Sequence, residues 1–93
     1  MSVAVYIPAF LQPFAGGRSR VLIDAAPATV DELLAELWRM HPGVRDRVID
    51  EQGRVRQHVN VFVDTESIRY TGGLATAVPD GCSITIVPAV SGG

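Results

Sequence analysis

The sequence predicts an α+β fold in which one helix packs against a mixed sheet of four to five strands. Stretches in which apolar residues alternate with period two flank a single stretch with helical periodicity. The chain has 93 residues, which is room for one domain. A single helix can cover only one face of a sheet.

The first two strands are predicted before the helix. Residues 3–8 (VAVYIP) alternate strictly, and residues 18–25 (RSRVLIDA) form the next strand and its hairpin partner. The loop between them contains Pro13 and the adjacent Gly16 and Gly17. We expect both glycines to adopt positive φ in a turn.

The helix begins after Thr29 and ends at Pro42. Thr29 is the predicted N-cap, and Glu32, three residues later, completes a capping box. Apolar residues recur at helical spacing, which predicts one buried face. They are Val30, Leu33, Leu34, Leu37 and Trp38.

The remaining strands follow the helix. Residues 44–53 are predicted as a connector that ends in a turn, and residues 54–64 (RVRQHVNVFVD) as the third strand. Residues 68–70 (IRY) form a short strand, and residues 83–88 (SITIVP) form the last one. Val61 and Val63 lie on one face of the third strand, and Ile84 and Ile86 lie on one face of the last strand. We expect the helix to cover the face of the sheet that carries both pairs.

Two hairpins joined by a right-handed crossover helix are typical of the β-grasp (ubiquitin-like) roll. We therefore predict a β-grasp domain over residues 1–88 and a flexible tail over residues 89–93 that ends in Gly-Gly.

The composition excludes several functions. All eight basic residues are arginine and the net charge is −2, which argues against nucleic-acid binding. One cysteine cannot form an internal disulfide, and no apolar stretch approaches the length of a membrane span. We expect a cytoplasmic protein that binds neither nucleic acid nor membrane.

The sequence also indicates no catalytic or metal site. His41 and His58 lack metal-ligand spacing, and no motif of a nucleophilic serine or a phosphate-binding loop occurs. Cys82 precedes the last strand on the Ile84 face, where we favour a small half-buried hydrophobe over a reactive thiol. We expect no enzyme, no metal and no bound cofactor.

The terminal Gly92 and Gly93 are either a frayed end or a reactive group. Two residues without side chains can enter a narrow channel, and the five residues after Pro88 extend roughly 15–18 Å. A partner could activate the carboxylate as an acyl adenylate, and a sulfur nucleophile could then convert it to a thiocarboxylate. We favour the reactive group, because the last predicted strand runs directly into the tail.

The C-terminal stretch DGCSITIVPAVSGG resembles the signature of the ubiquitin-like sulfur carriers. This family includes the small subunit of molybdopterin synthase and the sulfur carrier of the thiamine pathway. The sequence is most similar to the actinobacterial carriers of cysteine biosynthesis, and this resemblance spans the whole chain. It includes IPAFLQPFAGG, HVNVFVD and IRYTGGLATAVPDG. Relatives commonly carry an acidic residue where this chain has Cys82.

The resemblance implies that an E1-like ATP-dependent activating enzyme adenylates Gly93 and that sulfur transfer then yields a thiocarboxylate. In the cysteine pathway, the thiocarboxylate attacks an aminoacrylate held on pyridoxal phosphate by a cysteine-synthase-like enzyme. A zinc peptidase then releases cysteine from the carrier. ATP, pyridoxal phosphate and zinc are therefore expected in partners and not in this chain.

Three alternatives remain open: a molybdopterin synthase subunit, a sulfur carrier of a secondary-metabolite pathway, and a protein modifier that forms isopeptide bonds through Gly93. For the carrier reading, we expect partners such as the activating enzyme to dock on the sheet face opposite the helix. Strand parity places Phe62 and Val87 there, although a loop or another copy could cover Phe62 instead. The docking hypothesis predicts that Phe62→Ala weakens activation while the fold survives.

Overall fold

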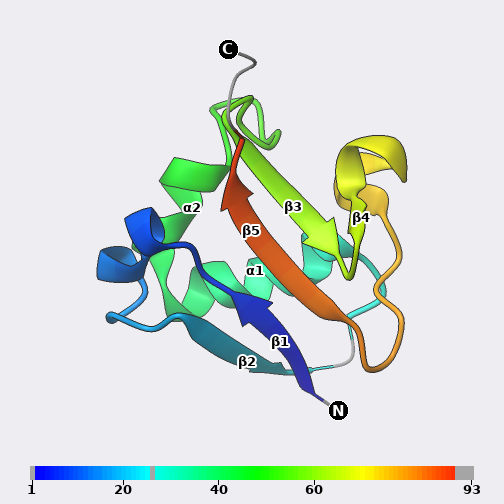
Figure 1. Cartoon of the computed structure of the whole chain (residues 1–93), viewed down its shortest axis with the longest axis horizontal. Coiled ribbons are helices and arrows are strands. Elements are labelled where there is room, and N and C mark those ends of the chain that lie inside the picture. The colour runs from blue at the N-terminus through cyan, green and yellow to red at the C-terminus, as the bar shows by residue number, and fades with distance from the viewer. Residues whose placement is uncertain (1, 26, 90–93) are drawn as a thin grey trace.

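The structure contains one mixed sheet, and the computed structural model describes residues 2–25 and 27–89. Its strands are β1 (Ser2–Tyr6), β2 (Arg20–Asp24), β3 (Val59–Val63), β4 (Glu66–Ser67) and β5 (Ser83–Pro88). They lie in the order β2-β1-β5-β3-β4 (Figure 1). The central pair, β1 and β5, is parallel, and the other neighbouring pairs are antiparallel. This topology confirms the predicted α+β roll.

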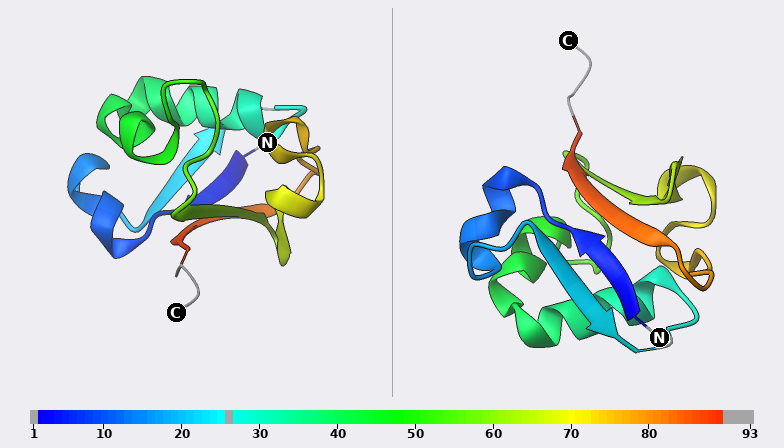
Figure 2. Two further views of the ribbon diagram at one scale, coloured as in Figure 1. Left: turned by 90° about the horizontal axis from the view of Figure 1, so that it is seen from above. Right: turned by 60° about the horizontal axis from the view of Figure 1, so that its bottom comes forward.

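Helices α1 (Val30–Met40) and α2 (Pro42–Val48) lie on one face of the sheet and leave the opposite face uncovered (Figure 2). The core fills the space between them. Its fully buried members come from both layers, as predicted for the helix stripe and for alternate strand positions. They include Val5, Val30, Leu33, Leu37, Val44, Val48, Val59, Val61 and Ile84. Trp38 is partly buried and packs against this core.

The start of α1 confirms the predicted N-cap at Thr29, whereas the reciprocal bond of the predicted capping box differs. The Thr29 hydroxyl oxygen accepts a hydrogen bond from the backbone N–H of Glu32 at 3.3 Å. The Glu32 carboxylate accepts one from the backbone N–H of Ala28, also at 3.3 Å. The reciprocal bond thus reaches one residue further back than in a standard capping box, and both bonds satisfy donors at the helix start.

The predicted connector after Pro42 is wrong in its first half, where the chain forms α2. Pro42 occupies the first turn of this helix, a position where its missing N–H costs nothing and its fixed φ is favourable. Val44 and Val48 lie four residues apart and are both fully buried. The proline therefore ends α1 and begins α2. The predicted turn at residues 50–53 is present, because the N–H of Gly53 donates to the carbonyl of Asp50 at 3.0 Å.

Residues 68–70 were predicted as a short strand and instead form a 3-10 helix, η2 (Ile68–Tyr70). The Ser67 hydroxyl oxygen accepts a hydrogen bond from the N–H of Arg69 at 3.3 Å, and such local bonds compete with strand pairing. Ile68 is 2% exposed and Tyr70 is 88% exposed, whereas a strand would place both on one face. The edge strand β4 comes just before, at Glu66–Ser67.

The other boundaries differ less. β5 has its predicted limits, and β1 and β2 form the predicted antiparallel hairpin. Their connecting loop contains the 3-10 helix η1 (Ala9–Phe14), followed by Gly16 and Gly17 at φ of 66° and 77°. β3 is shorter than predicted, because it begins only at Val59. A third 3-10 helix, η3 (Gly73–Ala75), follows η2.

Candidate functional site

The predicted reactive tail leaves the body at the end of β5. Ile84 and Ile86 anchor this strand in the core, and β1 and β3 pair with it on either side. One residue beyond β5, the N–H of Ala89 donates to the carbonyl oxygen of His58 at 2.8 Å. Gly92 and Gly93 lie outside the described residues. The structure therefore defines the point from which the tail departs.

A groove of about 620 Å³ begins at Ala89. It follows β3 on the side of the sheet where β4 and η2 lie. Its lining combines aromatic, amide and charged side chains. The lining residues are Gln57, Asn60, Phe62, Thr65, Glu66, Ser67, Arg69, Tyr70 and Ala89. We call this feature the tail groove.

The two predicted docking residues lie on the same uncovered face. Phe62 is the cross-strand partner of Thr85, and Asn60 is the partner of Val87. Partners in an antiparallel pair point to the same side of the sheet, opposite the buried Val61 and Ile86. Phe62 and Val87 are both half-buried, and only Phe62 lines the tail groove.

The sequence analysis missed Tyr70, which lines the same groove and is 88% exposed. A strand at residues 68–70 would have placed this tyrosine on the same face of the sheet as the buried Ile68. Because η2 replaces the strand, the ring projects into solvent. The sequence signal that could have identified Tyr70 as exposed is its position between an arginine and a Thr-Gly-Gly turn.

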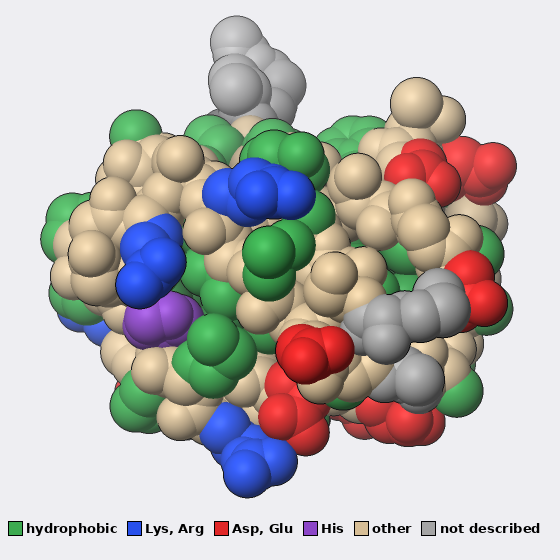
Figure 3. Space-filling view, turned by 90° about the horizontal axis from the view of Figure 1, so that it is seen from below, with side chains coloured by type: hydrophobic (Ala, Val, Ile, Leu, Met, Phe, Trp, Pro, Cys, Tyr) green, Lys and Arg blue, Asp and Glu red, His purple; other side chains and the backbone are tan. Residues whose placement is uncertain are grey.

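Among the described residues, the face seen from below does not offer a comparable apolar patch (Figure 3). Most exposed apolar side chains on that face are separated by polar and charged atoms.

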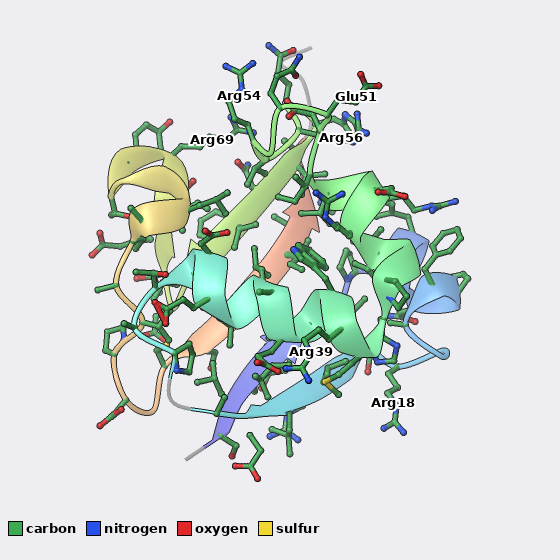
Figure 4. The ribbon with its side chains drawn as sticks, turned by 180° about the vertical axis from the view of Figure 1, so that it is seen from behind. Arg18, Arg39, Glu51, Arg54, Arg56 and Arg69 are labelled. Atoms are coloured by element: carbon green, nitrogen blue, oxygen red, sulfur yellow. The ribbon has the colours of Figure 1, made fainter. Side chains whose placement is uncertain are left out.

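Several arginines gather at the end of the molecule where β3 starts and β5 ends. Figure 4 shows Arg54, Arg56 and Arg69 near the start of β3, whereas Arg18 and Arg39 lie elsewhere. Arg56 Nε donates to the carbonyl oxygen of Asp46 at 3.0 Å. Arg69 Nε donates to Asn60 Oδ1 at 2.6 Å, and its Nη2 donates to backbone carbonyls between residues 56 and 59.

Cys82 stands at the opposite end of β5 from the tail and is 6% exposed. Burial raises the pKa of its thiol, and the negative charges of Asp64 and Asp80 raise the pKa further. A thiol with a raised pKa is a poor nucleophile at neutral pH. Cys82 is therefore a small hydrophobe as expected, and it is more deeply buried than the half-buried position that the sequence predicts.

Within residues 2–25 and 27–89, no group of three or more His, Cys, Asp or Glu side chains could hold a metal ion. Among the helices described, none is long and apolar enough to cross a membrane.

Comparison with known proteins gives consistent matches. The model of the ThiS family matches residues 5–93. The sulfur carrier protein CysO of Mycobacterium tuberculosis is 40% identical over 95 residues, covering 100% of both chains. Its crystal structure superposes with a TM-score of 0.86 at 39% identity, over 95% of this chain and 99% of that one.

Two further structures extend the comparison. The Amycolatopsis orientalis BexX/CysO complex matches with a TM-score of 0.85 and 38% identity, over 98% of this chain and 99% of the matched chain. The small archaeal modifier protein SAMP1 of Haloferax volcanii matches with a TM-score of 0.80 and 31% identity, over 100% of both chains. These matches confirm the ubiquitin-like β-grasp fold.

Proposed function

Because the chain belongs to the ThiS family, we propose that it is a sulfur carrier whose terminal glycine, Gly93, becomes a thiocarboxylate. The observation that carries the proposal is the continuity of β5 with the tail. The central, doubly paired strand ends at Pro88, and only three residues separate it from the Gly-Gly pair. A rigid body thus holds one end of a short chain whose other end has no side chains to obstruct an active site.

The chemistry takes place in partner enzymes. An activating enzyme joins the Gly93 carboxylate to the α-phosphate of ATP, which forms the acyl adenylate and releases pyrophosphate. Hydrosulfide then attacks the acyl carbon, so that a C–S bond forms, the C–O bond to AMP breaks, and AMP and a proton leave. The product is the thiocarboxylate anion. A closed partner site protects it from hydrolysis.

We propose that the activating enzyme docks on the tail groove. The groove starts at Ala89, so a partner that holds the tail in its active site is adjacent to Phe62 and Tyr70. Half-buried and exposed aromatic rings are typical anchors of protein interfaces. Val87, on the same face, extends this patch toward β5.

Cysteine biosynthesis is the pathway we favour, because the CysO sequence covers the whole chain at 40% identity. In this pathway, a pyridoxal-phosphate enzyme accepts the sulfur and a zinc peptidase frees the product. The matched structure from Amycolatopsis orientalis is a complex of a CysO protein with a partner, BexX. A carrier that serves another biosynthetic route uses the same tail chemistry.

A protein-modifier function is the second candidate, favoured by the 31% identity to SAMP1 over the whole chain. The chain has no lysine of its own, so lysine-linked chains of this protein on itself are excluded. Conjugates would therefore carry the protein on lysines of other proteins only.

The deciding experiment incubates the purified chain with ATP, sulfide and the activating enzyme of its host, and records intact and fragment masses. We expect one oxygen to be replaced by sulfur at Gly93. A chain truncated after Ser91 is the matched control and should remain unchanged. Cys82→Ala should still gain the shift, which excludes a persulfide on the thiol. An unmodified Gly93 in the complete mixture refutes the carrier proposal, and reductant-resistant conjugates in host extracts favour the modifier.

A further inference from the structure

The Arg69 guanidinium binds a cluster of uncharged acceptors next to the start of β3. Its Nε donates to Asn60 Oδ1 at 2.6 Å. Its Nη2 lies at 3.2, 3.0 and 2.7 Å from three backbone carbonyl oxygens. These belong to Arg56, Gln57 and Val59. The side chain reaches across 9 to 13 positions of sequence and holds the turn formed by residues 56–59.

The same turn holds the base of the tail. The one carbonyl of residues 56–59 outside this set is that of His58, and it accepts the N–H of Ala89 at 2.8 Å. The turn is also closed by the N–H of Val59, which donates to the carbonyl of Arg56 at 3.1 Å. Arg69 therefore binds three of the four carbonyls of this turn, and the fourth binds the residue from which the tail departs.

We propose that Arg69 is a positioning residue that sets where the tail leaves the body. This inference rests on the proposed carrier function. A partner must meet the carboxylate of Gly93 with the body docked, so the exit point at Ala89 decides whether the tail reaches the active site. If the turn moves, the tail departs from a different place, and the activating enzyme captures fewer productive complexes.

The role requires the geometry of arginine more than its charge. None of its four acceptors is a charged group. A guanidinium presents five N–H donors in a rigid plane and can bind the amide and the carbonyls together. A lysine ammonium is a point charge on a flexible stem and cannot reproduce this set. Arg69→Lys therefore distinguishes positioning from an electrostatic contact with a partner.

The first test needs no partner. Amide hydrogen exchange at Ala89 reports opening of its bond to His58. We expect exchange of Ala89 to accelerate about tenfold in both Arg69→Ala and Arg69→Lys, as the loss of hydrogen bonds of ordinary strength implies. Amides of β1 should keep their wild-type rates. Arg39→Ala is the matched control, because Arg39 pairs with Glu36 on the exposed surface of α1.

The second test measures activation by the host enzyme as pyrophosphate release. We expect kcat/KM to fall about tenfold in both Arg69 variants and to remain unchanged in Arg39→Ala. Asn60→Ala removes only one of the four contacts and should shift both readouts in the same direction by less. It serves as the test variant if Arg69→Ala does not fold.

The outcomes separate this inference from the carrier proposal. Unchanged Ala89 exchange in the Arg69 variants refutes the positioning role. Wild-type activation despite faster exchange refutes its part in the reaction. If Arg69→Lys restores activation, Arg69 acts through its charge and the inference falls. If the wild-type chain is not activated at all, the carrier proposal fails, while exchange at Ala89 still decides whether Arg69 holds the tail base.

Discussion

Tyr70→Ala removes an aromatic side chain that contributes little to folding. Tyr70 is 88% exposed. A tyrosine side chain offers about 200 Å² for burial, so folding buries only about 25 Å² of it. At about 25 cal/mol per Å², the substitution should lower the free energy of unfolding by no more than about 0.6 kcal/mol.

Docking on the tail groove would bury most of the same ring. Aromatic anchors at the centre of an interface typically contribute at least about 2 kcal/mol, which corresponds to a roughly 30-fold change in affinity. Because the ring is remote from the Gly93 carboxylate, the loss should appear in KM and leave kcat nearly unchanged. Phe62→Ala should act in the same direction and cost more stability, since Phe62 is half-buried.

The assay is pyrophosphate release by the host activating enzyme as a function of carrier concentration, paired with urea unfolding of each variant. We expect KM to rise at least tenfold in Tyr70→Ala, which is about 1.4 kcal/mol. Met40→Ala is the control, because Met40 is 51% exposed at the end of α1, on the helical side of the molecule. A KM within twofold of wild type for both aromatic variants would refute docking on the groove.

Three predictions concern stability. Burial raises the pKa of the Cys82 thiol, so the contribution of the protonated thiol to the free energy of unfolding is complete below the unfolded pKa of 9.0 and is lost as pH rises through the folded pKa. In urea unfolding, the wild type should therefore lose stability above pH 9.0 relative to Cys82→Ala. The same dependence of stability on pH in both proteins would contradict this prediction. Leu37→Ala leaves a cavity in a fully buried site and should cost about 2–5 kcal/mol in urea unfolding, and a loss comparable to that of a surface substitution would show that the core relaxes around it. Thr29→Ala removes the acceptor of the Glu32 N–H and should cost about 1 kcal/mol, whereas Thr29→Ser keeps the hydroxyl and should be nearly neutral by the same measurement.

The sequence alone determined the elements whose signals are local. The limits of β5 follow from strict alternation between Ser83 and Pro88, and the start of α1 follows from Thr29 and Glu32. Burial of Ile84 and Ile86 follows from the same alternation. The proposal for Gly93 likewise starts from the Gly-Gly pair and was made without coordinates. Each of these inferences depends on residues within a few positions of one another.

Tertiary structure decided the features that depend on distant contacts. Pro42 can end a helix or begin one, and burial of Val44 and Val48 against the core selects α2. Residues 68–70 form η2, which turns Tyr70 outward. The acceptors of Arg69 lie 9 to 13 positions away, and the tail groove brings Ala89 next to side chains from residues 57–70. Side-chain periodicity specifies which face of an element is buried, but only packing of the whole chain determines which exposed residues become neighbours.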